Sequence, residues 1–374
     1  MTIRFRLTTT AVAVIVVANS LLSLATFLYL SRVWLGEVQT RVHRNLNAAQ
    51  GVYEDYIAKI GELLKGRALD RNLIDAAQRN DRPVLEKMLR ELHDKGQIDF
   101  LEVLDPTGVV ISRAVGSQAG DSLSRDPLVA HAIRCREAAT CTVCVSRERL
   151  LANGGDLAER GRFEVIPTPA ARPTPNPVQT RGMVIAAAVP LLDSDGHLVG
   201  ILYGGDLLNR RYEIVDAIKR QVFPEEIYRG KDIGTVTIFQ DDVRISTNVT
   251  MDDVTRAVGT QMSASVSEEV LDRGETWAKP AFVVNDWYIT GYAPIRDPDQ
   301  RIIGALYVGL LQAPFLHQRN TVFAAFLTIV LAATTASLLL LFLATELVLR
   351  PIRYVVAMAQ KVIGGDLSAR VGIR

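Results

Sequence analysis

Two uncharged, apolar stretches, residues 7–31 and 320–345, constrain this chain of 374 residues more than any other feature. A bilayer core about 30 Å thick needs roughly 20 helical residues, so each stretch is long enough to cross it. Lipid cannot satisfy bare backbone polar groups, which makes helix the expected structure of both. The alternatives are a cleaved signal peptide for the first stretch and a buried core helix for the second. We expect two transmembrane helices.

The basic residues near these stretches set the expected orientation. Arg350, Arg353 and Lys361 follow the second stretch and favour a cytoplasmic C-terminus. Arginines stand on both sides of the first stretch, so the rule is ambiguous there. With two spans, the cytoplasmic N-tail (1–6) and the C-terminal segment (346–374) are expected inside, and residues 32–319 outside.

Residues 32–95 are predicted to form a helical stalk and the start of a sensor region. Apolar positions recur there at steps of three and four with one polar interruption, which is typical of a coiled-coil seam that dimerises. An amphipathic helix that covers its own domain is the alternative, and a long helix can serve both in succession, as we expect. A second helix is predicted from Pro83 to His93, where proline suits the first turn. The seam residues are Leu35, Val38, Val42, Asn45, Ala49, Val52, Tyr56 and Leu63.

Strand–turn–strand patterns occur four times between the two apolar stretches. GTVTIFQDDVRISTNV is similar to FLEVLDPTGVVISRAV, and DWYITGYAPIRDPDQRIIGALYVGL is similar to MVIAAAVPLLDSDGHLVGILYGG. This internal duplication predicts module one (96–206) and module two (207–319). Module one is longer because of a Pro-rich segment, residues 165–180, which is predicted to be a loop or lid. Each module is expected to be an antiparallel sheet with helices on one side, an α+β fold.

Catalytic and nucleic-acid-binding functions are not indicated. The sequence has no P-loop, no HExxH and no GxSxG in a strand–turn–helix setting, so we expect neither an active site nor a cofactor. The 42 basic and 41 acidic residues are balanced, which gives no reason to expect a nucleic-acid partner.

Module two contains the residue types that a small anionic ligand needs, namely a cation, hydrogen-bond donors and aromatic walls. In an extended strand, Arg244, Ser246 and Asn248 would share one face, and Tyr288, Thr290 and Tyr292 would share another, with Trp287 opposite. We predict that a small, carboxylate-bearing ligand binds there. The alternative is that the aromatic residues belong to the core and that Arg244 forms a structural ion pair. The predicted ligand-binding residues are Arg244, Asn248, Trp287, Tyr288 and Tyr292.

All three cysteines lie close together in the sequence, near one histidine. His131 and Cys135 would share one face of a helix, and Cys141 and Cys144 have a metal-knuckle spacing, so a zinc site is one option. A c-type haem is not, because Val145 stands where the histidine is needed. In an oxidising compartment, the favoured interpretation is one disulfide with one free thiol, and three free thiols are the remaining option.

The region between the apolar stretches resembles the Cache superfamily of bacterial extracytoplasmic sensors in its double form. The resemblance covers about residues 32–313 and is densest in GTVTIFQDDVRISTNV, AFVVNDWYITGYAPI and IIGALYVGLLQAPF. It implies two PAS-like modules on a long N-terminal helix. ELVLRPIRYVVAMAQKVIGGDLSARV, after the second stretch, resembles the start of a HAMP linker through Pro351 and a seam that Gly364 and Gly365 end. The seam residues are Ile352, Val355, Ala359 and Val362.

This resemblance implies a homodimeric, two-pass receptor in the bacterial inner membrane that senses a small periplasmic molecule. Family members of this layout usually continue into a histidine kinase, and sometimes into a chemoreceptor or cyclase output. The chain ends at Arg374, before a second HAMP helix, and looks truncated. We expect a histidine kinase as the output, with a response regulator as its cytoplasmic partner. The alternatives are a methyl-accepting chemoreceptor that acts through an associated kinase, and a redox or metal sensor that uses the cysteines.

Overall fold

The computed structural model of the chain describes residues 3–95, 98–116, 119–168, 170–174, 176–223, 225–252 and 254–363. These residues divide into two compact units. The helical unit contains the two ends of the chain, residues 1–37 and 313–374, and the sensor unit contains Val38–Gln312.

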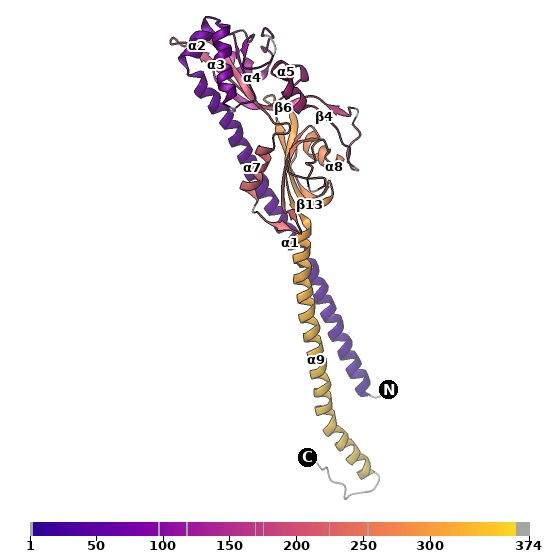
Figure 1. Cartoon of the computed structure of the whole chain (residues 1–374). Coiled ribbons are helices and arrows are strands. Elements are labelled where there is room, and N and C mark those ends of the chain that lie inside the picture. Colours follow the sequence, from indigo (N-terminus) through magenta and orange to yellow (C-terminus); the bar gives the residue numbers. More distant parts are fainter. Residues whose placement is uncertain are drawn as a thin grey trace. The chain divides into compact units, whose positions relative to one another are not determined.

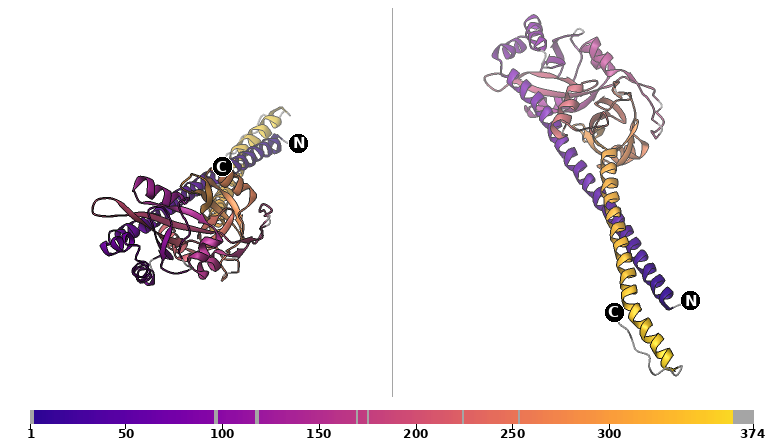
Figure 2. Two further views of the ribbon diagram at one scale, coloured as in Figure 1. Left: turned by 90° about the horizontal axis from the view of Figure 1, so that it is seen from above. Right: turned by 60° about the horizontal axis from the view of Figure 1, so that its bottom comes forward.

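The helical unit consists of the first part of helix α1 (Ile3–Ala68) and most of helix α9 (Gln312–Ile363). Within this unit the two helices lie side by side and run antiparallel to each other (Figures 1 and 2). The Asn19 amide donates to the Thr334 hydroxyl at 2.6 Å, and the rings of Phe27 and Phe323 are 4.8 Å apart. Both helices are long and apolar enough to cross a membrane, and their apolar windows are not buried in protein.

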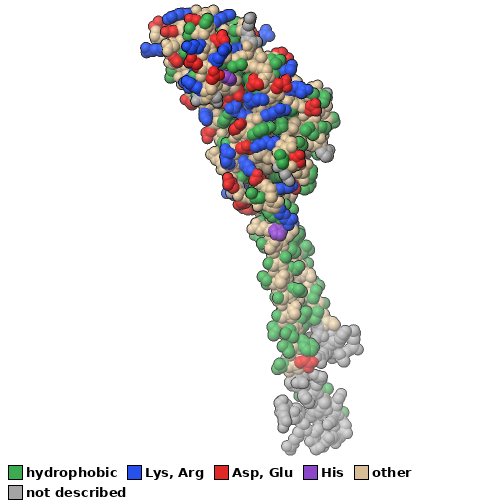
Figure 3. Space-filling model, viewed as in Figure 1, with side chains coloured by type: hydrophobic (Ala, Val, Ile, Leu, Met, Phe, Trp, Pro, Cys, Tyr) green, Lys and Arg blue, Asp and Glu red, His purple; other side chains and the backbone are tan. Residues whose placement is uncertain are grey.

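Figure 3 shows the surface that results from this composition. Hydrophobic side chains follow one another along the helical unit, and charged side chains gather over the sensor unit. The predicted spans, 7–31 and 320–345, fall inside α1 and α9. Helix α9 is described as far as Ile363, and the predicted break at Gly364 and Gly365, with the rest of the GGDLSARV stretch, lies outside the described residues.

The first sheet of the sensor unit has five antiparallel strands in the order β2-β1-β7-β6-β3. Two long hairpins, β1–β2 and β6–β7, supply four of these strands, and β3 is an edge strand. Asp105 makes the first hairpin turn possible, because its carboxylate accepts the backbone N–H groups of Thr107 and Val109. The bounds are β1 (Phe100–Leu104), β2 (Val110–Arg113), β3 (Ala139–Val145), β6 (Gly182–Leu192) and β7 (Leu198–Leu207).

The second sheet repeats this architecture in the order β11-β10-β14-β13-β12. All of its pairs are antiparallel, and again two hairpins are followed by one edge strand. The equal strand order agrees with the internal duplication and confirms the predicted α+β class. The bounds are β10 (Gly234–Gln240), β11 (Val243–Thr247), β12 (Trp277–Val283), β13 (Asp286–Arg296) and β14 (Ile302–Leu311).

In the first sheet, helices lie on both faces, α2 (Arg71–Gln78) on one and α4 (Pro127–Cys135) on the other, so the prediction of helices on one side only is wrong there. Each module contains a buried apolar cluster. Phe100 and Tyr203 lie in the first core, and Phe239, Tyr292 and Tyr307 lie in the second. The remaining helices are α3 (Arg82–Asp94), α5 (Arg147–Ala152), α6 (Gly155–Gly161), α7 (Tyr212–Val222), α8 (Ala264–Ser267) and a π-helical turn (Glu268–Asp272). Two short ribbons complete the unit: β4 (Phe163–Glu164) with β5 (Val178–Gln179), and β8 (Ile227–Tyr228) with β9 (Lys231–Asp232).

From Val38 onward, α1 packs against its own sensor unit. Tyr53 bonds to the Thr142 hydroxyl at 2.8 Å, and Tyr56 donates to the Asp206 carboxylate at 2.8 Å. The buried stripe therefore drifts from the predicted seam: Asn45, Val52, Tyr56 and Leu63 are only half-buried, because the stripe follows the sheets rather than a strict heptad. The fully buried positions are Val38, Val42, Leu46, Ala49, Tyr53, Ile60, Leu64 and Ala68.

Candidate ligand-binding site

A β-bulge in the second sheet determines where Arg244 points. Ile238 pairs with Ser246, but the next residue, Phe239, pairs with Arg244, so the residue of β11 between them has no paired residue on β10. Directly paired residues share a sheet face, which puts Arg244 on the core face with Phe239 and moves Ser246 to the other face. The prediction that Arg244 and Ser246 share a face is wrong for this reason. Ser246 donates instead to the Arg211 carbonyl at 2.7 Å.

Arg244 is buried in the core of module two, with 2% of its surface exposed. Its Nη1 donates to the Thr260 hydroxyl, and the guanidinium carbon lies 5.0 Å from the centre of the Phe239 ring. Its Nε has no hydrogen-bond partner, and no carboxylate of the described residues forms an ion pair with it. Burial lowers the pKa of Arg244, because the charged form loses its hydration. The predicted alternative of a structural ion pair does not hold among the described residues.

Three tyrosines lie in the same core as the Phe239 ring that this guanidinium contacts. The rings of Tyr292 and Tyr307 are 4.8 Å apart, and the Tyr307 hydroxyl bonds to the Thr235 hydroxyl at 3.1 Å. Tyr288, Tyr292 and Tyr307 belong to the same apolar cluster as Phe239, whose ring lies beside the guanidinium. The guanidinium therefore lies in an aromatic core, and no carboxylate of the described residues balances its charge.

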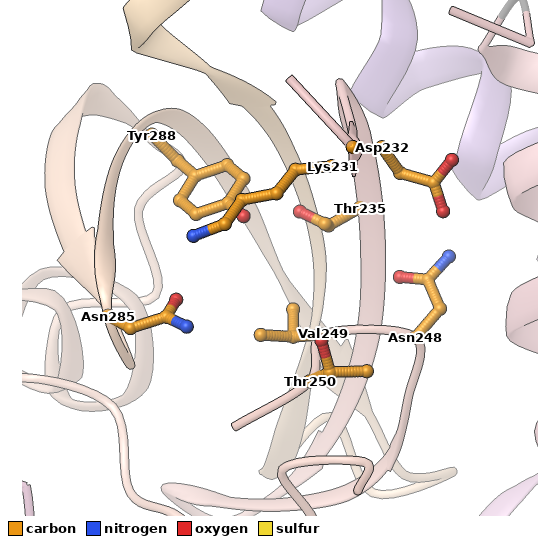
Figure 4. Close-up of a pocket in the computed structure, with 9 residues that line it drawn as sticks. Lys231, Asp232, Thr235, Asn248, Val249, Thr250, Asn285 and Tyr288 are labelled. Carbon is orange, nitrogen blue, oxygen red and sulfur yellow. The ribbon is translucent and has the colours of Figure 1, made fainter. Parts of the chain in front are cut away.

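A cavity of about 140 Å³ opens beside this core (Figure 4). Its wall is mostly polar, and the Asn248 amide nitrogen there is buried without a hydrogen-bond partner. The other end of that amide accepts the Val236 N–H at 2.7 Å, which fixes its orientation. Lys231 at the mouth forms an ion pair with Asp286 at 2.5 Å. The lining residues are Gly230, Lys231, Asp232, Thr235, Asn248, Val249, Thr250, Asn285 and Tyr288.

The structure distributes the five predicted site residues over three places. Asn248 and Tyr288 line the cavity, whereas Arg244 and Tyr292 lie in the adjoining core. Trp287 lies on the opposite sheet face, as its strand position predicts; it is 55% exposed and packs against Phe282.

Sequence reasoning missed several residues of this region. Tyr307 was recoverable, because it repeats Tyr203 in the duplicated Leu-Tyr dipeptides of β7 and β14. Thr235 and Lys231 carry no local signal. Their place in the cavity depends on pairings between strands far apart in the sequence.

In module one, a cluster of paired, mostly buried charged side chains occupies the corresponding part of the molecule. Glu102, with no exposed surface, pairs with Arg113 at 2.8 Å and also contacts Arg149. Asp121 bonds to both arginines, so each of these charges has a partner. By register, Glu102 and Arg113 correspond to Thr237 and Thr247 of module two, which bond to each other at 2.6 Å.

The cysteine and histidine candidates do not come together. Cys135 is exposed at the end of α4, and Cys141 and Cys144 lie on β3, whose three-residue spacing puts them on opposite faces. All three thiols are free, so the favoured disulfide is absent and the metal-knuckle interpretation lacks its geometry. Within the described part of the chain, His131 and these thiols form no group with metal-ligand spacing.

Comparison with known protein families gives a match over one of the two modules, module two. Residues 206–322 match the model of the family described as single cache domain 3, which confirms the resemblance to Cache sensors. No curated protein matches the chain.

Several solved structures are similar at low identity. The periplasmic domain of Vibrio cholerae LuxQ is 13% identical, with 72% of this chain and 99% of that chain covered and a TM-score of 0.41. The sensor domain of the V. cholerae histidine kinase DctB is 13% identical, with 75% and 98% covered and a TM-score of 0.38. The ligand-binding domain of Mlp24 with asparagine is 13% identical, with 77% and 99% covered and a TM-score of 0.40.

A Cache module in a chain with two helices of membrane-spanning length supports the role of a transmembrane sensor. The HAMP linker, the output domain and the ligand are taken up as proposals below.

Proposed function

We propose that this chain is the receptor part of a homodimeric sensor histidine kinase in the bacterial inner membrane. Residues 7–31 and 320–345 are the spans, and residues 32–319 lie in the periplasm, with module one distal to the membrane and module two proximal. The antiparallel arrangement of α1 and α9 in the helical unit supports this topology, since the start of α1 and the end of α9 then point the same way.

The ligand of this receptor is a small, carboxylate-bearing molecule that binds to module two. One observation carries the proposal: Arg244 is a buried guanidinium whose Nε has no partner and whose charge has no carboxylate. A carboxylate would supply the missing acceptor and remove the desolvation cost of the unbalanced charge. The adjoining cavity at Asn248 and Tyr288 is the entry route.

Module two is the binding module because two arginines of module one already have a carboxylate partner. Arg113 and Arg149 share Glu102 as a built-in carboxylate. A ligand carboxylate would have to displace this fully buried side chain, and that exchange brings little net gain.

The signal passes from module two into α9, because β14 ends at Leu311 and α9 begins at Gln312. A ligand that favours one of two arrangements of the sheet shifts the population of both protomers. The shift travels along α9 into residues 346–374, the proposed start of a HAMP linker, and from there to a kinase that phosphorylates a response regulator.

Thermal melting of the full chain in detergent tests this proposal. Acetate, succinate and other small carboxylates are added singly, and the matched amides, acetamide and succinamide, serve as uncharged controls. A ligand at 100 times its Kd stabilises the folded state by about 2.7 kcal/mol, which raises the melting temperature visibly. A carboxylate that raises it in the wild type but not in Arg244→Met supports the site. Equal responses in both chains reject it.

A further inference from the structure

The Pro-rich insertion of module one reaches across to module two. Its described residues Phe163–Thr168 and Ala170–Arg172, here called the strap, lie between α6 and β6 and have no counterpart in module two. The β4–β5 ribbon anchors the strap on its own side. Just beyond the strap, Arg181 forms an ion pair with Asp241 of module two at 2.5 Å, which also joins the two modules.

Several hydrogen bonds attach the strap to one segment of module two, residues 259–264. The Ile166 N–H donates to the Gly259 carbonyl at 2.8 Å, and the Ile166 carbonyl accepts the Gln261 N–H at 3.3 Å. The Ala170 carbonyl accepts the Ala264 N–H at 2.7 Å, and the Thr168 hydroxyl donates to the Gln261 carbonyl at 3.2 Å. The strap thus pairs with this segment through two isolated β-bridges, Ile166 with Thr260 (parallel) and Ala171 with Ser263 (antiparallel).

The same segment holds Arg244 from the other side. The Arg244 N–H donates to the Thr260 carbonyl at 3.0 Å, and the Gly259 N–H donates to the Arg244 carbonyl at 2.8 Å. The Thr260 hydroxyl donates its single proton to the Ala257 carbonyl at 2.8 Å. Its lone pairs are therefore directed at the guanidinium, which fixes the Arg244 side chain.

Gly259 allows the close approach between strap and segment. Its φ is +88°, and a Cβ there would lie 2.5 Å from the Glu164 carbonyl oxygen of the strap. Any other residue at this position would push the strap away.

We propose that the strap is a positioning element of the module-two site: by holding residues 259–264, it fixes Thr260 and hence the orientation of Arg244. The binding site of one module is then incomplete without a segment of the other. The proposal rests on the proposed function in that it concerns the same arginine, and it identifies Thr260 as a positioning residue.

The test measures the labelling of Arg244 by phenylglyoxal, an arginine-selective reagent, in the ligand-free full chain by peptide mass spectrometry. Burial protects Arg244, so labelling reports local opening. Gly259→Ala is expected to speed labelling about tenfold, because the paired hydrogen bonds to the strap are lost. Gly196→Ala is the matched control, since Gly196 has a φ of +80° but open space around its Cβ position. It should label at the wild-type rate.

Two further variants separate positioning from general loosening. Thr260→Val should also speed labelling, whereas Thr260→Ser, which keeps the hydroxyl, should restore the wild-type rate. If Gly259→Ala does not fold, Ile166→Pro removes the strap's N–H donor instead. Wild-type labelling of Arg244 in the folded strap variant overturns the proposal. Because no ligand is present, this result is independent of whether carboxylates raise the melting temperature.

Discussion

Arg244 occupies in the second sheet the register position that Val110 occupies in the first. Leu104 pairs with Val110 and Phe239 pairs with Arg244, and each pair follows a bulge at the same place in its hairpin. The duplicated modules therefore differ by a buried apolar residue in one and a buried cation in the other. Module one adopts the same fold without a cation at this position. Folding therefore does not require Arg244, which points to a role of this residue in recognition.

Replacement of Arg244 by methionine should leave the unliganded chain at least as stable as the wild type. The change removes a buried charge without a carboxylate partner and keeps an unbranched side chain of similar length. We expect a gain of about 1–3 kcal/mol, measured as a raised melting temperature in detergent. Arg256→Met is the control, because Arg256 forms a two-bond ion pair with Asp216 at 2.8 Å. That variant should melt lower, and a comparable loss in Arg244→Met would contradict the absence of a counter-ion.

Substitution of Glu102 by glutamine should destabilise the chain and create an anion site in module one. The carboxylate is fully buried between Arg113 and Arg149, so its loss leaves buried positive charge and costs about 3–5 kcal/mol. Chloride or acetate should then raise the melting temperature of Glu102→Gln more than that of the wild type. Glu62→Gln, which removes an exposed partner of Lys65, should change stability by less than about 1 kcal/mol. Equal anion responses in Glu102→Gln and the wild type would count against the built-in carboxylate.

The stabilisation by Asp99 should disappear in acid. Burial raises the pKa of Asp99, but hydrogen bonds and charges from Arg160 and Arg211 outweigh it, so the net pKa lies below the ordinary value. A lowered folded-state pKa means that the carboxylate stabilises the fold above the unfolded pKa of about 3.9 and that this contribution is lost as pH falls through the folded pKa.

Denaturant unfolding of wild type and Asp99→Asn from pH 7 to pH 3 measures this contribution. The difference should be about 2 kcal/mol at pH 7 and should shrink below about pH 4. Asp75→Asn, at an exposed site 3.8 Å from Arg79, should show almost no difference at either end. If the difference in the free energy of unfolding between wild type and Asp99→Asn grows as the pH falls, the pKa of Asp99 is raised in the folded state and not lowered.

The three thiols should alkylate as free groups, and at very different rates. Cys135 is exposed, whereas burial raises the pKa of Cys144 to about 12, which suppresses its thiolate at neutral pH. Iodoacetamide should label Cys135 first and Cys144 last in the native chain. All three should label after denaturation without reductant. Labelling of only one thiol under those conditions would indicate a disulfide and revive the redox interpretation.

Local patterns were sufficient to predict most elements of the sensor unit. The helix from Pro83 to His93 matches α3, where Asp81 caps the helix by accepting the Val84 N–H. The four hairpins follow from alternating strands around turns such as Asp105–Gly108, because turn residues act within a few positions of one another. The sequence predicts that the Pro-rich segment is a loop or lid. It does not predict that this segment pairs with residues 259–264 of module two, since that pairing is non-local.

Hydrophobic periodicity and turn chemistry are local properties, so the two apolar spans, the duplicated α+β modules and the residue types available for a ligand can be predicted from short stretches of sequence. Tertiary structure decided which side chains meet. A single bulge places Ser246 and Arg244 on opposite faces of the second sheet, and the strap brings Ile166 to Gly259. Glu102 pairs with two arginines of module one, whereas Arg244 of module two has no counter-ion among the described residues. These outcomes depend on strand register and on contacts between distant segments, which no short stretch of sequence contains.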